Sequence, residues 1–310
     1  MIILKKFRKG KRIDRTIMKT FPSATLSEIY KWLRIGKIKV NGKKKKGDYK
    51  LNEEDEIKIF LSDEQILDYK QKGVVHKTSF EVLFEDEYFL IVNKPPFLAS
   101  QGGIGVKENN LVNQVRYYLK GTDTTVALAN RLDIGTSGII IFGKSEKANS
   151  TLYQLTKKRA IQKTYYALTI EKPKPARGTM DCYIKKSTRD YVPIMKVCKK
   201  ADANSKHAIT EYKTLESKES YALLELILKT GRMHQIRLQF SSKNAAVLGD
   251  KTYGNEKINK KWSKLLKRQF LHAAKVKFTH PFTKKKLEIS APLSKDLQRV
   301  LKKLKFDHSF

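Results

Sequence analysis

The stretch "NRLDIGTSG", residues 130–138, holds residue types that can do chemistry. Arg131 and Asp133 lie two residues apart, and the turn-forming "GTSG" leads into the apolar run "IIIF". A charge beside a buried strand is costly unless it is paired or used. Taken alone, an aspartate in this place is more often a turn cap than a catalytic group. Asp133 is therefore either a turn cap or a functional carboxylate, and which of the two depends on what the rest of the chain brings to it.

A second stretch, "TGRMHQIR", follows a long apolar strand and carries Arg232, His234, Gln235 and Arg237. Arg237 falls on the turn after Gly231, where its guanidinium can hold a carboxylate. His234 by itself is typical of a hydrogen-bonded structural residue. No cysteine or acidic residue has metal-ligand spacing with it, so we expect no metal site.

A third stretch, "KTYYALTI", has the pattern of a strand and offers Lys163, Tyr165 and Tyr166. Adjacent residues of a strand point to opposite faces. Only one of the two tyrosines can therefore face a site, and the other is expected in the core.

The elements that must position these residues are mostly strands. We predict two short strands in "FEVLFEDEYFLIVN", strands in "IIIF" and "YALLELILKTG", and a hairpin in "KVKFTHPFTKKKLEIS". "TLYQLTKKRA" is expected to form a helix, and "RMHQIRLQFSS" to open another. The chain has no repeat and no regular strand–helix alternation, so we predict an α+β fold with a mainly antiparallel mixed sheet.

One motif is misleading. "GIIIFGKS" satisfies the Walker A pattern by its letters, but its variable positions form an apolar strand. A phosphate cradle needs a glycine-rich loop with free backbone N–H groups. We therefore expect no nucleotide cofactor.

The first 60 residues have a different pattern, a helix that leads into a basic hairpin. Thr25 and Glu28 have capping-box spacing, an apolar stripe follows on Leu26, Ile29, Tyr30 and Leu33, and Gly36 can end the helix. Ile38 and Val40 alternate before the hairpin signal Asn41-Gly42. The run Lys43–Lys46 alone would be a solvated turn. The whole arrangement favours RNA binding, through Arg12, Lys31, Arg34, Lys37, Lys39, Lys43, Lys44, Lys45 and Lys46.

Composition supports a polyanionic partner. The chain has 310 residues, a formal net charge of +34, and 52 lysines against 13 arginines. Such a balance is typical of nucleic-acid-binding proteins, although a lysine-rich proteome would also raise it. Apolar runs are too short for a membrane span or a signal peptide, and two cysteines are too few for a zinc site. We expect a cytoplasmic protein that does not bind membranes.

The segment "KRIDRTIMKTFPSATLSEIYKWLRIGKIKVNGKKKK" resembles the small RNA-binding module first seen in a small-subunit ribosomal protein, the S-four-like or alpha-L domain. A Gly-Asp pair that is usual near the end of that module is Glu54-Asp55 here. The resemblance implies a small α+β RNA-binding domain over residues 1–60.

The region from Phe80 to the early 300s resembles the RluA-type pseudouridine synthases, in the large-ribosomal-subunit branch. Six landmarks come in order: "EDEYFLIVNKPPF", "NRLDIGTSGIII", "KTYYAL", "LKTGRMHQIR", "VLGDKTYG" and "LHAAKVKFTHP" to "SAPLSKDL". The family normally has His before Arg-Leu-Asp, where this chain has Asn130. The resemblance implies domains at 1–60 and 80–303, a linker at 61–79 and a tail at 304–310.

The implied reaction detaches uracil from its ribose, rotates it and rejoins it through carbon 5, and it needs no cofactor. The resemblance makes Asp133 the nucleophile, Arg237 its partner and Tyr165 the residue that stacks on the base. Asp133 would either attack the ring or help to form a glycal at the ribose. A uridine in folded RNA must be flipped out. Arg131, Asn130, Arg232, His234 and Gln235 are the implied substrate-binding residues.

Ribosomal RNA of the large subunit is the expected substrate, with transfer RNA as the alternative, and we expect a monomer. A second hypothesis is an inactive RNA-binding or ribosome-assembly protein with the same fold, against which Asp133, Tyr165 and Arg237 argue. A third, an aspartyl-nucleophile hydrolase, is disfavoured because no second carboxylate or histidine clearly lies beside Asp133 in the sequence.

Overall fold

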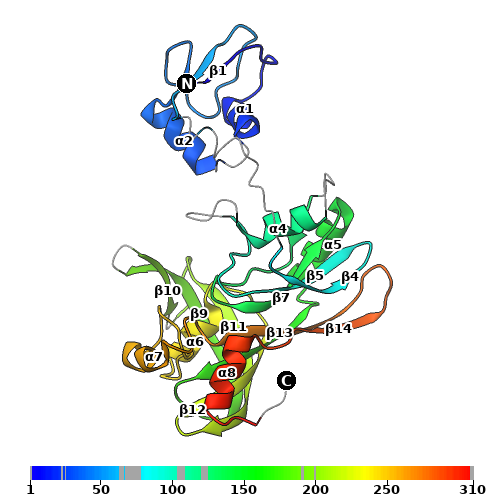
Figure 1. Ribbon diagram of the computed structural model, residues 1–310, viewed down its shortest axis with the longest axis vertical. Coiled ribbons are helices and arrows are strands. Elements are labelled where there is room, and N and C mark those ends of the chain that lie inside the picture. Colours follow the sequence, from blue (N-terminus) through cyan, green and yellow to red (C-terminus); the bar gives the residue numbers. More distant parts are fainter. Residues whose placement is uncertain are drawn as a thin grey trace. The chain divides into compact units, whose positions relative to one another are not determined.

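The computed structural model describes residues 2–21, 24, 26–62, 66, 78–102, 109–119, 125–189, 192–198 and 200–307. The chain divides into two compact units, one of Met1–Thr78 with Gln101–Tyr118 and one of Ser79–Ser100 with Leu119–Phe310 (Figure 1). Thr25 of the predicted capping box, most of the predicted linker 61–79 and residues 308–310 lie outside the described residues.

The first unit contains a small antiparallel sheet with the strand order β1-β3-β2 and, in the part that the structure describes, three helices. Its core includes Ile13 and Ile17 of α1 and Ile29 and Leu33 of α2, all buried. The elements are β1 (Ile2–Leu4), α1 (Ile13–Thr20), α2 (Leu26–Ile35), β2 (Ile38–Val40), β3 (Ile57–Ile59) and α4 (Leu111–Tyr118).

The predicted helix is confirmed as α2, but its apolar stripe is only half buried. Ile29 and Leu33 enter the core, whereas Leu26 and Tyr30 are 42% and 40% exposed. Gly36 follows the helix with φ +80°, a left-handed conformation that suits glycine at a helix end. The stripe does not enter the core as a whole, and Tyr30 lines a cavity that is described below.

The predicted Asn41-Gly42 turn is confirmed, since both residues have positive φ and Val40 and Lys43 exchange backbone hydrogen bonds across it. The lysine run does not form the second strand, because β2 pairs with β3 instead. Asp55 stabilises this region, since its buried carboxylate accepts hydrogen bonds from Asn41 Nδ2 at 2.8 Å and Asn52 N at 2.9 Å. The Glu54-Asp55 departure from the module's pattern therefore keeps the carboxylate that holds the turn.

The second unit is built on one large sheet with the strand order β10-β9-β11-β12-β8-β13-β7-β5-β4, with β14 on β13 and β6 on β7. Every pair is antiparallel except β7 with β13, so the predicted mainly antiparallel mixed sheet is confirmed. The strands are β4 (Glu81–Glu85), β5 (Phe89–Lys94), β6 (Ala127–Leu128), β7 (Ser137–Gly143), β8 (Gln162–Thr169), β9 (Arg177–Arg189), β10 (Val192–Cys198), β11 (Lys206–Lys218), β12 (Tyr221–Leu228), β13 (Leu271–Thr279) and β14 (Lys286–Ser290).

The strands at the centre of this sheet are buried. Every residue of β7 is buried, and its neighbour β5 is nearly so. The N–H groups of the "GIIIFGKS" stretch belong to the β5–β7 ladder, which is incompatible with a phosphate cradle. Gly138 has φ +112°, and a Cβ there would lie 2.2 Å from the Ala273 carbonyl oxygen. Glycine is needed at this position for the close approach of β7 to β13.

The helices of the second unit are α5 (Glu146–Lys157), α6 (Gln235–Ser241), α7 (Glu256–Trp262) and α8 (Lys295–Lys303). Ser145 caps α5 by accepting a hydrogen bond from Ala148 N. The predicted helix after Gly231 is α6, but it begins at Gln235 and not at Arg232. Arg237 therefore lies in a helix and not on the turn where the sequence placed it.

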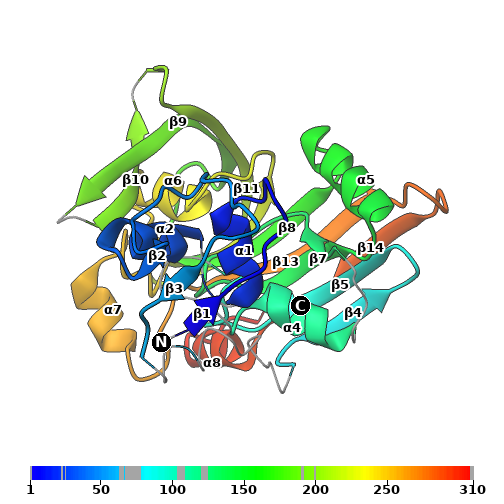
Figure 2. The ribbon, with the colours of Figure 1, turned by 90° about the horizontal axis from the view of Figure 1, so that it is seen from above.

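The long hairpin of β9 and β10 and its neighbour β11 were not predicted (Figure 2). Their segments mix polar and apolar residues without a regular alternation, as in "MDCYIKK" of β9, and so lack the pattern that predicts a half-buried strand. Cys182 and Cys198 lie on this hairpin as free thiols. Among the described residues, no helix is long and apolar enough to cross a membrane.

Candidate active site

Asp133 and Arg237, 104 residues apart in the sequence, meet in an ion pair. Arg237 Nη1 donates to Asp133 Oδ2 at 2.7 Å, and the Asp133 side chain keeps 27% of its surface exposed. The turn itself is closed by the backbone, because Thr136 N–H donates to the Asp133 carbonyl at 2.9 Å. The carboxylate is therefore directed to a guanidinium and remains open to solvent, unlike that of a turn cap.

Arg237 is held on its other side by Asp250. Nε and Nη2 donate to the two oxygens of this fully buried carboxylate at 2.7 and 2.8 Å. Burial opposes the charge of Arg237, but Asp250 first and Asp133 second raise its pKa above the ordinary value. Burial would likewise raise the pKa of Asp250, but Arg237 and backbone N–H groups lower it. The pair is charged, and the two-pronged contact fixes the plane of the guanidinium that faces Asp133.

His234 completes the surroundings of Asp133. Its Nε2 lies 3.9 Å from Asp133 Oδ2, and its Nδ1 lies 2.9 Å from the Tyr253 hydroxyl. That hydroxyl accepts a hydrogen bond from Met195 N, so it can donate its own hydrogen to Nδ1 and leave the imidazole hydrogen on Nε2. Burial lowers the pKa of His234, and Asp133 opposes this effect. The expectation that no histidine lies beside Asp133 was wrong, because the left-handed backbone of His234 (φ 54°) turns the chain before α6.

The turn after Asp133 is held by side chains from β5 and the approach to β13. Lys94 Nζ contacts the Ile134 carbonyl at 3.4 Å, and Arg268 Nη1 donates to the Gly135 carbonyl at 2.9 Å. Gln269 Nε2 donates to Thr136 Oγ1 at 3.1 Å, and His272 Nδ1 lies 2.9 Å from Ser137 Oγ. Each residue from 134 to 137 has a partner of its own, so the backbone that carries Asp133 is rigid.

Arg268 is the centre of this support. Its side chain is 1% exposed and forms a two-pronged ion pair with Asp296 of α8 at 2.6 and 3.0 Å. Lys94 is fully buried, and its Nζ also donates to the carbonyls of Pro95 and Leu98 at 2.8 Å. Burial first and the charge of Arg268 second lower the pKa of Lys94, Asp133 opposes them, and the result is about 7.

Tyr165 lies on β8 opposite Leu226 and Ala273, whereas Tyr166 lies opposite Glu225 and His272. Both rings are 5% exposed. Burial, and then the charge of Asp133, raises the pKa of Tyr165, so its hydroxyl is protonated at neutral pH. Successive residues of β8 point to opposite faces of the sheet, so only one of the two tyrosines can face the candidate site.

The structure brings together only part of the predicted substrate-binding set. Arg131 is exposed and Asn130 half-buried beside Asp133 in the chain. The Gln235 amide is directed away, since its Nε2 donates to Ile209 O and Thr210 Oγ1 of β11. Arg232 Nε donates to the His207 carbonyl of the same strand at 3.1 Å. Gln235 and Arg232 thus attach the start of α6 to β11.

The sequence had assigned no role to Asp250, Lys94, Arg268 or Asp296. Asp250 lies in the "VLGDKTYG" landmark, and Lys94 precedes Pro95-Pro96. The scarcity of arginine was a usable signal for Arg268, because an arginine in a lysine-rich chain marks a place where a planar guanidinium is needed. Among the described residues, no group of three or more His, Cys, Asp or Glu side chains is gathered to hold a metal ion.

The chain is similar to known RNA pseudouridine synthases over most of its length. The family model described as RNA pseudouridylate synthase matches residues 88–242. "Ribosomal large subunit pseudouridine synthase C" of Rickettsia bellii (strain RML369-C) is 33% identical over 301 residues, which cover 93% of this chain and 96% of the relative. "Uncharacterized RNA pseudouridine synthase YhcT" of Bacillus subtilis (strain 168) is 30% identical over 289 residues, 92% of this chain and 91% of the relative.

A solved structure has the same fold. "Human RNA Pseudouridylate Synthase Domain Containing 4" aligns with a TM-score of 0.61 at 22% identity, over 74% of this chain and 94% of the human chain. The family model spans half of the chain, and the Rickettsia relative aligns with nearly all of it. This chain therefore belongs to the RNA pseudouridylate synthase family.

Proposed function

We propose that this enzyme isomerises uridines of large-subunit ribosomal RNA to pseudouridine, with Asp133 as the nucleophile. The observation that carries the proposal is the Asp133–Arg237 ion pair, held from behind by buried Asp250. Relatives named for the large ribosomal subunit support the substrate. Transfer RNA is the alternative substrate. The enzyme acts as a cytoplasmic monomer without a cofactor.

The reaction breaks the bond from C1′ of the ribose to N1 of uracil and forms a bond from C1′ to carbon 5. The proton leaves carbon 5, and N1 gains one. A carboxylate nucleophile must be ionised, and desolvation around a bound base would favour its neutral form. Arg237 opposes that effect at 2.7 Å, and the Nε2–H of His234 points a second dipole toward the same oxygen. Arg237 is thus placed to stabilise a negative charge on the Asp133 carboxylate when the substrate closes the site.

Tyr165 is assigned to contact the flipped uracil with its ring. Its hydroxyl is protonated in the free enzyme, and the charge of Asp133 contributes to this. Once Asp133 is consumed in a covalent bond, that charge is gone and the phenol becomes easier to deprotonate. A protonated phenol has no place for the carbon 5 proton, so Tyr165 can take that proton only after it has donated its own, for which N1 of the detached uracil is the acceptor. Arg131, exposed beside Asp133, is assigned to the RNA backbone or to the gap that the flipped base leaves.

Asp133→Asn tests the nucleophile. It keeps shape and hydrogen bonding but removes the charge, so pseudouridine formation should be abolished while RNA binding stays near wild type or becomes slightly tighter. Single-turnover release of tritium from carbon 5 of uridine measures conversion, and melting temperature is followed on the same samples. Residual conversion above roughly one part in a thousand, about 4 kcal/mol of barrier, would contradict the assignment.

Asp86→Asn is the matched control. The Asp86 carboxylate caps the β4–β5 turn by accepting hydrogen bonds from Tyr88 N at 2.8 Å and Phe89 N at 2.7 Å. Its loss should lower the melting temperature and leave the activity of the folded fraction intact. An Asp133→Asn variant that behaved in this way would show that Asp133 is a turn cap.

We also propose that the first unit binds RNA through its basic residues, the role expected from the sequence. Five of the nine predicted RNA-binding residues line one cavity of this unit: Arg12, Arg34, Lys44, Lys45 and Lys46. Lys31 and Lys43 are exposed, and Lys37 and Lys39 half-buried, in the same unit. The basic surface supports this role, and its contribution to affinity is testable by salt dependence.

A further inference from the structure

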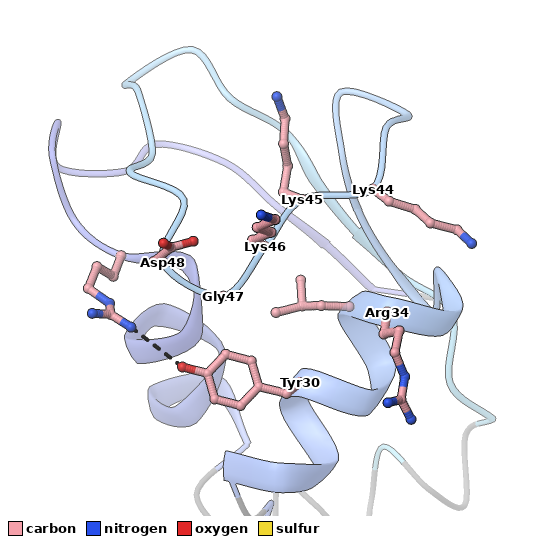
Figure 3. Close-up of a pocket in the computed structure, with 9 residues that line it drawn as sticks. Tyr30, Arg34, Lys44, Lys45, Lys46, Gly47 and Asp48 are labelled. Carbon is pink, nitrogen blue, oxygen red and sulfur yellow. Dashed lines mark hydrogen bonds between the residues drawn. The ribbon is translucent and has the colours of Figure 1, made fainter.

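The first unit contains a cavity of about 680 Å³ between α2 and the segment 44–48 (Figure 3). Tyr30 and Leu33 of α2 line one side, and the backbone at Gly47 lines the other. Pockets of this size hold small ligands of a few rings. The cavity is therefore large enough for one nucleotide and too small for a helix of RNA.

Tyr30 is a fixed platform in this cavity. Its hydroxyl donates to Asp14 Oδ2 at 3.0 Å, and the Asp14 side chain is only 2% exposed because Arg12 covers it with a two-pronged ion pair. Gly47 packs on the ring, since a Cβ at that residue would lie 1.9 Å from Tyr30 Cε1. The ring is held at its tip and along one side, yet Tyr30 is 40% exposed. An exposed aromatic ring held in one orientation loses little freedom when a second ring stacks on it.

The charges around the cavity lie at its rim. Five lining residues are basic and one, Asp48, is acidic. Lys44, Lys45 and Arg34 extend in different directions from the cavity, while Tyr30 points into it (Figure 3). Cations that converged on one point would suit a small free anion. Cations spread around an aromatic floor suit a ring flanked by separate phosphates.

We propose that this cavity takes the base of one unpaired nucleotide of the RNA substrate, stacked on Tyr30, while the rim cations contact the flanking phosphates. The proposal rests on the RNA-binding role proposed above for the first unit, and it adds a requirement for an unpaired base. An acidic peptide would use the same cations, but it has no need of a fixed aromatic ring. The observations therefore favour RNA.

The test uses the full chain and two RNA hairpins that carry the same phosphates. One hairpin has a bulged adenosine, and the other has an abasic residue at the same position. Fluorescence anisotropy should show that the wild type binds the bulged base about tenfold more tightly, at the lower end of what one stacked base contributes. Tyr30→Leu should bind both hairpins equally. Tyr30→Phe should keep most of the preference because the ring remains.

Phe60→Leu is the matched control, because Phe60 is an exposed aromatic residue of the same unit (42%) that does not line the cavity. It should keep the tenfold preference. The catalytic site contributes equally to RNA affinity in all variants. If Tyr30→Leu still prefers the bulged base, that preference arises elsewhere in the protein and the proposal is overturned. Equal binding of the two hairpins by the wild type also overturns it.

A second measurement needs no variant to fold. With 2-aminopurine as the bulged base, wild-type binding should quench the fluorescence through stacking, and an unchanged signal would overturn the proposal.

A variant with Lys44, Lys45 and Lys46 all replaced by alanine separates the base-binding proposal from the RNA-binding role on which it rests. Affinity for both hairpins should fall and the salt dependence should become flatter, with the base preference retained. If affinity and salt slope are unchanged for both RNAs, the RNA-binding role of the unit is wrong. If polyglutamate displaces both hairpins equally from the wild type and no base preference exists, the cavity is a peptide site and the proposal falls.

Discussion

At the scale of single residues, the guanidinium of Arg237 pairs with Asp133, and Asp250 holds that guanidinium in place. Asp250 is fully buried, and it accepts hydrogen bonds from Thr252 N and Tyr253 N as well as from Arg237. Removal of one member of a buried pair leaves an uncompensated charge, which typically costs about 3–5 kcal/mol. Asp250→Asn should therefore lower the melting temperature and reduce turnover of the folded fraction. Calorimetry and single-turnover conversion measure the two effects.

The control is Glu211→Gln, which breaks a surface pair with Lys229 whose two side chains are 45% and 43% exposed. Pairs of this kind contribute about 0–1 kcal/mol, so neither stability nor turnover should change much. Equal effects of the two substitutions would mean that Asp250 does not support the site.

Arg237→Lys tests the geometry of the contact. Lysine keeps the charge but cannot contact Asp133 and both oxygens of Asp250 at once. We expect turnover to fall about 100-fold, the loss typical of one preorganised donor in an active site. RNA affinity should stay near wild type. Turnover within threefold of wild type would show that Asp133 needs only a nearby positive charge.

Tyr165 and Tyr166 are adjacent, equally buried and on opposite faces of β8. Tyr165→Phe keeps the ring and loses the hydroxyl, so folding should be preserved while turnover falls about 100-fold, as for the loss of a proton-transfer group. Tyr166→Phe is the control and should be mild. If Tyr166→Phe is the damaging change in the tritium-release assay, the assignment of faces on β8 is wrong.

At the scale of elements, the turn at 134–137 is a rigid mount for Asp133. Arg268 contacts Gly135 O and Ser137 Oγ while it is paired with Asp296, and a lysine cannot make all three contacts. Arg268→Lys should lower kcat about tenfold with KM little changed, because a misplaced nucleophile affects the chemical step and not binding. Steady-state kinetics separate the two parameters. The control is Arg299→Lys, because Arg299 is an exposed residue of α8. If Arg268→Lys raised KM alone, Arg268 would not be the residue that positions Asp133.

The same turn has a consequence for the pH dependence of stability. The pKa of Lys94 is lowered by burial to about 7 in the folded protein, against an ordinary value of 10.5. Between these two values the unfolded state binds more protons, so the contribution of Lys94 to the free energy of unfolding rises with pH. Below pH 7 both states are protonated and its contribution is constant. Urea unfolding of the wild type and Lys94→Met from pH 6 to 10 should give a difference that changes in this direction, and a constant difference would contradict it.

At the scale of the whole molecule, charge is concentrated at the start of the chain. Residues 1–60 contain 18 basic and 7 acidic residues, a net charge of +11 from about a fifth of the length. The candidate catalytic residues all lie beyond residue 130. Removal of residues 1–60 should therefore lower RNA affinity and flatten its salt dependence, because fewer counterions are released. If the salt dependence of RNA affinity were unchanged, residues 1–60 would not be an RNA-binding segment.

The sequence by itself determined the local elements and the chemistry available. Apolar runs specify β5, β7 and β8 because a strand buried on both faces needs no polar position. The turn at 41–42 and the helix end at Gly36 follow from residues that tolerate positive φ. Six ordered landmarks were enough to identify the family and to name Asp133, Tyr165 and Arg237. The hairpin of β9 and β10 was not predicted because its strands mix polar and apolar residues without the regular period-2 alternation of a half-buried strand.

Only the tertiary structure decided which of these residues meet. Arg237 faces Asp133 across 104 residues, whereas Gln235, two positions earlier, is directed to β11. The sequence showed no histidine clearly beside Asp133, yet His234 Nε2 lies 3.9 Å from its carboxylate. Arg268 gains its role from Gly135 and Ser137, which lie 133 and 131 residues away in the sequence. The physical reason is that local patterns encode which residues are buried, while the partner of a buried charge depends on strand register and helix packing between distant segments.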